Sequence, residues 1–169
     1  MELFESINNR RSIRKFKKDY IVSEEEIKIL LEAGMSSPSA LNARPYEFIV
    51  VSNKEIKNKL YEAHPRAKMI LEASIVIVCV ARPDLQKSEN DYFAQDLGAV
   101  TENILLAATG LGLGSCWCGV YPNQERVQKV SKILSIDKGI PFNYIVIGKA
   151  DETPIKRGYY QEEKVTFLK

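Results

Sequence analysis

The chain has 169 residues, of which 45% are hydrophobic and 27% charged, and its 24 basic and 22 acidic residues leave a formal charge of +2. These values are typical of one globular domain and give no general attraction to nucleic acid. The longest apolar run, residues 75–81, is too short to span a bilayer, and the N-terminus lacks the pattern of a signal peptide. We therefore expect a cytoplasmic protein with no membrane or nucleic-acid partner. Three cysteines leave one over in any pairing, so reduced thiols are expected.

The positive charge is concentrated just after a short predicted N-terminal helix. Six consecutive positions hold Arg10, Arg11, Ser12, Arg14 and Lys15. In an extended chain side chains alternate in direction, so Arg10, Ser12 and Arg14 point the same way. Guanidinium groups bind phosphate through two parallel hydrogen bonds, so this row suits a phosphorylated ligand. On this segment alone, a solvated basic arm is the alternative.

A helix and a long loop follow. Ser23 and Glu26 form a capping box, which predicts a helix whose apolar face continues to Gly34. The ten residues 36–45 contain two prolines and many small polar side chains, which exclude regular structure. Loops of this length inside a compact domain often bind ligands, so residues 36–45 are a second candidate site. A plain connector is the alternative.

The middle of the chain predicts the centre of a sheet. A strand is expected over residues 47–52, followed by a helix that Asn53 caps. The only histidine, His64, follows that helix and is predicted to be a surface or capping residue. Residues 74–81 are apolar on both faces, which is typical of a central strand covered on both sides.

The longest helical pattern covers residues 91–111 and is apolar nearly all round. Such a helix is buried on several sides, and one sheet covers only one of them. We therefore expect it to pack against a second copy of the protein; other helices of the same chain are the alternative. The glycines at 110–114 lack the order of strand, glycines and helix that a dinucleotide fingerprint requires. They are predicted to end the helix and permit a reversal.

The remaining elements complete a single domain that spans residues 1–169. A strand over 115–120, a helix over 122–134 and a core strand over 142–148 are expected. The tail, residues 149–169, is polar and alternates imperfectly near its end. Such a tail rarely packs well on its own domain, so exchange with a partner subunit is expected.

Several of these stretches together resemble the nitroreductase family of flavin mononucleotide (FMN) enzymes. They are RRSIRKF at 10–16, PSALNARP at 38–45, QD at 95–96, GLGSCW at 112–117, and, later, Gly148, Arg157 and EKV at 163–165. The likeness covers essentially the whole chain in the family's order and spacing, so it is far more specific than any single motif.

The resemblance implies an α+β fold in which a three-layer α/β/α sandwich has a central mixed, mainly antiparallel sheet. It also implies an interlocked homodimer with two FMN sites at the interface. The cofactor-binding residues that it predicts are Arg10, Arg11, Ser12, Arg14, Lys156 and Arg157 near the phosphate and ribityl chain, Pro38, Ser39, Ala40 and Asn42 from the other subunit, and Trp117, Cys118 and Gly119 beside the ring. A backbone N–H of this last strand is expected to meet flavin N5.

The implied activity is transfer of hydride from NADH or NADPH through flavin N5 to a small-molecule acceptor by a ping-pong mechanism. A nitroaromatic, quinone or similar conjugated acceptor fits. Because the flavin carries the two-electron chemistry, no catalytic triad or carboxylate pair is needed, and none is visible. The alternative is a non-catalytic module that stores flavin or senses redox state, with Cys116 and Cys118 facing the same side of a strand. No metal site is expected.

Two positions depart from the family pattern. Arg44 stands where many relatives have glutamine. The lysine that often supports the flavin pyrimidine edge has no sure counterpart: Lys68 is the nearest candidate, and Met69 is the ungapped match.

Overall fold

Four antiparallel strands form the centre of the computed structural model, which describes residues 2–87, 91–155, 158 and 160–168. The strands are β1 (Tyr46–Val51), β2 (Ile75–Ala81), β3 (Gly114–Gly119) and β4 (Ile140–Gly148), in the spatial order β1-β2-β4-β3. Every pairing between them is antiparallel. The parallel pairing seen in the described residues is an isolated bridge between Ser12 and Ser115, outside the named strands.

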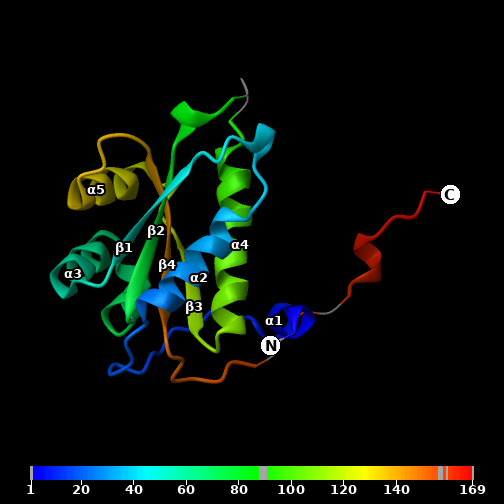
Figure 1. The fold of residues 1–169 in the computed structure, drawn as a ribbon, viewed down its shortest axis with the longest axis horizontal. Helices are drawn as coiled ribbons and strands as arrows, with labels where there is room; N and C mark the ends of the chain where they lie inside the picture. Colours follow the sequence, from blue (N-terminus) through cyan, green and yellow to red (C-terminus); the bar gives the residue numbers. More distant parts are fainter. Residues whose placement is uncertain (1, 88–90, 156–157, 159, 169) are drawn as a thin grey trace.

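Helices cover both faces of the sheet, which confirms the predicted three-layer sandwich. Figure 1 shows α3 and α5 on one side and α2 and α4 on the other. The helices are α1 (Leu3–Asn9), α2 (Glu24–Met35), α3 (Lys54–Ala63), α4 (Phe93–Gly110) and α5 (Gln124–Leu134); the short 3-10 helices are η1 (Ala40–Asn42), η2 (Pro65–Leu71), η3 (Pro83–Leu85) and η4 (Glu162–Lys164).

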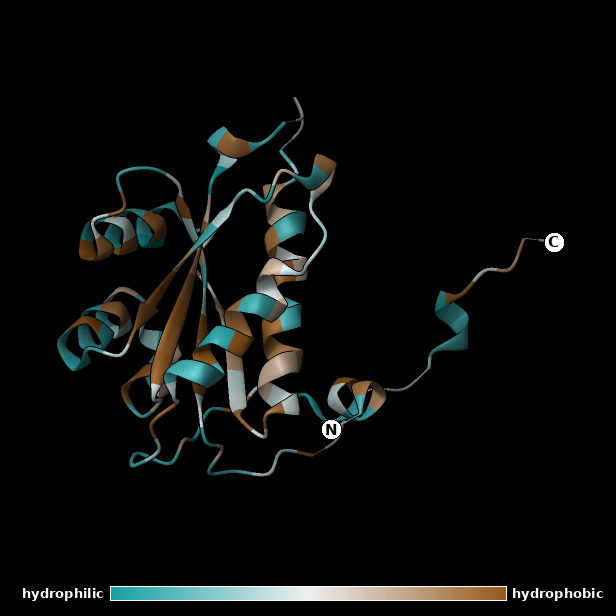
Figure 2. Cartoon of the chain, viewed as in Figure 1, coloured by the Kyte–Doolittle hydropathy of each residue, from teal (hydrophilic) through white to brown (hydrophobic). Residues whose placement is uncertain are grey.

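Strand β2 is buried at every position, as its apolar sequence predicts. Val76, Val78 and Val80 belong to the hydrophobic cluster on the α3/α5 side. Ile75 and Ile77 belong to the cluster on the α2/α4 side. In Figure 2 this strand is accordingly among the most hydrophobic parts of the ribbon. The sheet therefore divides the core into two layers.

The predicted helix signals are confirmed by hydrogen bonds. Ser23 and Glu26 form both bonds of the capping box, and the Asn53 side chain accepts the N–H of Ile56 at 3.0 Å. After α4 the chain reverses through Gly112, whose φ of 70° suits glycine. His64 caps the C-terminus of α3, but it is only 7% exposed. Its capping position is as predicted, and it is not a surface residue.

Helix α1 contacts α4 at the edge of the sandwich, and the tail runs beside the basic segment as far as residue 151 before residues 160–168 extend away from the sandwich (Figure 1). Large apolar side chains on both are exposed: Leu3, Phe4, Ile7, Ile155, Tyr160, Phe167 and Leu168. Exposed apolar patches of this kind commonly mark interaction surfaces. Among the described residues, no helix is long and apolar enough to cross a membrane.

Candidate functional site

The basic segment, residues 10–16, is extended and attached to the core. The N–H of Ile13 donates to the carbonyl of Ser115 at 2.8 Å, and Ile13 and Phe16 are buried in the α3/α5 cluster. Glycine at position 114 permits this approach, because a Cβ there would lie 3.0 Å from Ile13 Cγ2. The segment therefore lies directly beside the start of β3.

Four side chains of this segment line one open hollow of about 600 Å³. The lining residues are Arg10, Arg11, Ser12, Arg14, Pro154, Ile155 and Gly158. Strict alternation would send Arg11 to the opposite side, yet it lines the same hollow. The predicted residues Lys156 and Arg157 lie outside the described part of the chain. The hollow thus gathers three cations and a hydroxyl, which is a suitable set for a phosphate dianion.

Two carboxylates that the sequence reasoning missed help to hold this segment. Glu102 on α4 pairs with Arg10, with 3.0 Å between Oε1 and Nε. Glu152 accepts the backbone N–H of Arg14 and also that of Lys15, the latter at 3.1 Å. The presence of a charged residue, Glu102, in an otherwise apolar helix could have indicated the first contact. Nothing in the sequence indicates the contacts of Glu152.

The outer edge of β3 offers backbone groups beside the hollow. The Ser115 carbonyl points outward to Ile13, while the N–H of Val120 donates inward to Phe142 at 3.0 Å. Alternation along an antiparallel strand then directs the N–H groups of Trp117 and Gly119 outward and that of Cys118 toward β4. Of the predicted residues, Gly119 and Trp117 therefore present N–H groups at this edge. The Trp117 ring is 39% exposed and lies 6.4 Å from that of Phe142.

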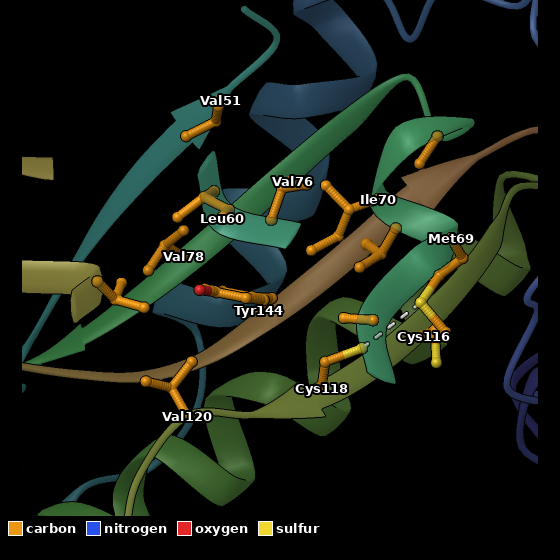
Figure 3. Close-up of a cluster of buried hydrophobic side chains, with 14 of the residues drawn as sticks. Val51, Leu60, Met69, Ile70, Val76, Val78, Cys116, Cys118, Val120 and Tyr144 are labelled. Carbon is orange, nitrogen blue, oxygen red and sulfur yellow. Dashed lines mark hydrogen bonds between the residues drawn. The ribbon is translucent and has the colours of Figure 1, made fainter. Parts of the chain in front are cut away.

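The side chains of Cys116 and Cys118 face the same side of β3, as predicted, and point into the core. Figure 3 shows both sulfurs near Met69, and Cys118 Sγ lies 3.9 Å from Met69 Sδ. A hydrogen bond between the two thiols, assisted by the charge of Arg14, lowers the pKa of Cys116, and the same bond together with burial raises the pKa of Cys118. The side chain of Cys118 therefore points into the core and its backbone N–H points toward β4, so neither faces the outer edge of β3.

Met69 and Lys68, the two candidates for the flavin pyrimidine edge, lie in different surroundings. Met69 is buried in the α3/α5 cluster, and Lys68 is exposed on η2. Met69 is thus part of the core, and Lys68 remains the exposed candidate.

The loop at 36–45 is built around a carboxylate of α4. The N–H of Ala40 donates to Asp96 Oδ1 at 3.0 Å, and the N–H of Arg44 donates to Ser39 Oγ at 2.9 Å. Leu41, Asn42 and Arg44 have φ near 50°, a left-handed conformation that costs most residues energy. The expectation of an irregular loop is correct apart from the single turn η1. Asp96 belongs to the family motif, but no pattern in the sequence indicates its hydrogen bond with Ala40.

This loop lines a second hollow, of about 400 Å³. Its lining residues are Pro38, Ser39, Ala40, Tyr92, Gln95, Asp96 and Ala99. Among the described residues, the two hollows share no lining residue, and Asn42 lines neither. One chain therefore places the predicted residues of the basic segment and of the loop in two separate hollows, and Trp117, Cys118 and Gly119 line neither of them.

The sequence profile of the Nitroreductase family matches residues 7–69 and 63–149. This chain belongs to the nitroreductase family. This nitroreductase-family chain is 40% identical over 166 residues to a Methanothermobacter thermautotrophicus protein named "Putative NADH dehydrogenase/NAD(P)H nitroreductase", an alignment that covers 98% of this chain and 86% of the relative. A protein of the same name from Archaeoglobus fulgidus is 42% identical over 163 residues, which are 96% of this chain and 88% of the relative.

Solved structures confirm the nitroreductase fold. A Parabacteroides distasonis protein of the same name matches with a TM-score of 0.91 and 32% identity, covering 98% of this chain and 96% of the other. An "FMN-dependent Nitroreductase" from Clostridium difficile R20291 matches with a TM-score of 0.89 and 28% identity, covering 98% and 99%.

Proposed function

We propose that this member of the nitroreductase family is an FMN-dependent NAD(P)H oxidoreductase. The observation that carries the proposal is the hollow lined by Arg10, Arg11, Ser12 and Arg14. The segment that lines it pairs with Ser115 of β3, the strand whose outer edge presents N–H groups. A phosphorylated flavin has an anionic phosphate that suits the arginines of the hollow and a ring with acceptor atoms that suits the N–H groups of the strand edge. Relatives named as an NAD(P)H nitroreductase and as an FMN-dependent nitroreductase support the same donor and cofactor.

The residues present fit FMN, and each has a defined task. The arginines of the hollow would hold the phosphate, Ser12 would donate to a phosphate or ribityl oxygen, and the N–H of Gly119 would donate to the ring. Trp117, whose side chain is partly exposed, would cover the ring edge. When bound, FMN supplies the two-electron hydride chemistry. The chain therefore needs only to bind, orient and shield.

The proposed reaction is ping-pong. The nicotinamide of NADH or NADPH and a conjugated acceptor, such as a nitroaromatic or a quinone, are both planar rings that require the same flavin face. They therefore bind in turn, and the donor leaves before the acceptor enters.

We also propose that a second copy completes the site. The loop residues Pro38, Ser39 and Ala40 lie apart from the basic segment of their own chain. In a homodimer the loop of one subunit reaches the ring held by the other, with Asn42 nearby. The exposed apolar side chains of α1 and of the tail at 149–169 give such a dimer an apolar surface, and the tail embraces the partner.

The test begins with an absorbance spectrum of the protein after incubation with FMN and desalting. A retained two-band flavin spectrum and saturable oxidation of NADH or NADPH with an acceptor are expected. Tight flavin binding without nicotinamide oxidation would support the storage or sensing module instead. A protein that never retains flavin would refute both.

The phosphate contacts are tested by Arg10→Ala combined with Arg14→Ala. Since hydrogen bonds to charged groups contribute about 1.5–3 kcal/mol each, FMN affinity should fall by about a hundredfold or more. Lys17→Ala with Lys18→Ala removes two exposed cations outside the hollow and should change affinity little. Equal losses in both double variants would defeat the assignment.

A further inference from the structure

Arg126 occupies an unfavourable place for a cation. It lies in the first turn of α5, where the helix dipole is positive and acidic residues are preferred. Its backbone is fixed by the cap of the helix, because the Asn123 side chain accepts its N–H at 2.8 Å. The guanidinium in turn donates from Nη1 to the carbonyl of Gly119 at 2.7 Å. A residue that opposes the helix dipole but makes a short bond to β3 suggests a role at the strand.

His64 reaches the same place from the end of α3. Burial, above all, and the charge of Arg126 lower the pKa of His64, while the neighbouring backbone of His64 itself and of Gly119 acts in the opposite direction. The hydrogen bond that holds the Gly119 carbonyl comes from Arg126 on α5, and the His64 ring lies close to it.

Gly119 is also the residue whose N–H points to the open edge of β3. Fixing its carbonyl restricts the rotation of the residue and so the direction of that N–H. Gly119 has no side chain whose packing could hold this direction. A Cβ at this position would make only an ordinary contact, 3.7 Å from the Tyr121 carbonyl oxygen. The hydrogen bond from Arg126 to the Gly119 carbonyl therefore adds to the pairing with β4, in which the Val120 N–H of the same peptide unit donates to Phe142, in orienting this residue.

The charge of Arg126 is felt around this end of the strand. Burial raises the pKa of Tyr144, and Arg126 opposes the rise; Arg126 likewise opposes the rise of the pKa of Cys118. Tyr144 and Cys118 point into the same cluster in Figure 3. A charge beside a poorly solvated region acts more strongly than it would in water.

We propose that Arg126 is a positioning residue of the flavin site, which orients Gly119 through its carbonyl and keeps a positive charge beside the ring-facing edge. The charge favours reduced, anionic FMN over oxidised FMN. The inference rests on the proposed function and adds to it a residue that determines the reduction potential.

The experiment compares the two-electron midpoint potential and the FMN affinity of the FMN-loaded protein and its variants. Arg126→Gln and Arg126→Met remove the charge and should weaken binding of reduced FMN relative to oxidised FMN about tenfold, which equals a potential lower by about 30 mV. Arg126→Lys keeps the charge and should retain most of the potential. Lys129→Gln is the matched control, since it removes one cation of the same helix whose Nζ bonds Glu125 at 2.6 Å.

The outcomes separate this inference from the proposed function. A wild-type protein that retains no FMN refutes the function itself. If the wild-type protein binds FMN but the Arg126 variants have the same midpoint potential as Lys129→Gln, only the role of Arg126 is refuted. Equal lowering of the potential by the Lys, Gln and Met variants refutes the charge effect. A result from either the Gln or the Met variant decides, so the failure of one to fold leaves the test intact.

Discussion

The basic segment at 10–16 and the loop at 36–45 are held in place by different forces. The basic segment pairs with β3 through its backbone and buries Ile13 and Phe16 in the core. The loop buries only the side chains of Ser37 and Pro45 and adopts left-handed conformations at three non-glycine residues. It is held by a bond from the Ala40 N–H to Asp96 and, at its end, by the Pro45 carbonyl, which accepts the N–H of Arg82 at 2.8 Å. The first is as stable as the core that it joins, and the second can open locally.

This difference suits two tasks. A phosphate site needs fixed cations, because its affinity depends on hydrogen-bond geometry. A loop that covers a ring must let substrates enter and leave, and low local stability permits such movement. We therefore expect loss of core packing to disturb mainly the basic segment at 10–16. Loss of one hydrogen bond should disturb mainly the loop at 36–45.

The largest effect is expected from Ile13→Ala. Removing this buried side chain should lower the free energy of unfolding by about 3 kcal/mol and also weaken FMN binding, because the basic segment loses its anchor. Ile77→Ala, in the centre of β2, should cost similar stability and leave FMN affinity nearly unchanged. Denaturant unfolding and FMN titration measure both quantities. Equal FMN affinities in the two variants would show that burial of Ile13 does not position the arginines.

A smaller effect, confined to the loop, is expected from Asp96→Asn. The carboxylate accepts from Ala40 and, at 3.1 Å, from Gln86, so the neutral amide should cost about 1.5 kcal/mol. Amide hydrogen exchange should become faster over residues 38–45 and stay unchanged over 10–16. The exposed Asp91→Asn is the control. Faster exchange in both regions would contradict the independence of the two.

The smallest effect is expected from Leu41→Asn. Leu41 has a φ of 51° and is 66% exposed, and asparagine tolerates this conformation better. The free energy of unfolding should rise by about 0.5 kcal/mol, which is part of the left-handed cost. Ile21→Asn, at an exposed residue without positive φ, should show no gain. A lower free energy of unfolding in Leu41→Asn would mean that the contacts of the leucine stabilise the protein by more than its left-handed conformation destabilises it.

Local signals in the sequence predicted much of the fold. The capping box at Ser23 and the apolar run at 75–81 act through neighbouring residues, so their physics is visible in a short window. The location of the Cys116 and Cys118 side chains on the same face of β3 likewise follows from strand geometry. The family resemblance then supplied the order of the layers, which local patterns do not determine.

The supports of the site could not be predicted, because they join residues far apart in the sequence. Asp96 bonds a residue 56 positions away, and Glu152 bonds one 138 positions away. Leucine and arginine give no signal of a left-handed conformation at 41 and 44. Regular alternation would place Arg11 on the side opposite to Arg10, Ser12 and Arg14, whereas the family resemblance includes it among the cofactor-binding residues. The structure places Arg11 on the same hollow as the other three.

Helix α4 carries attachments to both halves of the site, and its pitch determines how they relate. Asp96 and Glu102 are six residues apart, which is about 9 Å along the axis and, at 3.6 residues per turn, about 120° around it. The helix therefore directs the loop and Arg10 along diverging radii. In the homodimer that we propose, a second copy of α4, related by a twofold axis, supplies the loop from another direction. The proposed FMN site then uses one attachment from each of the two helices.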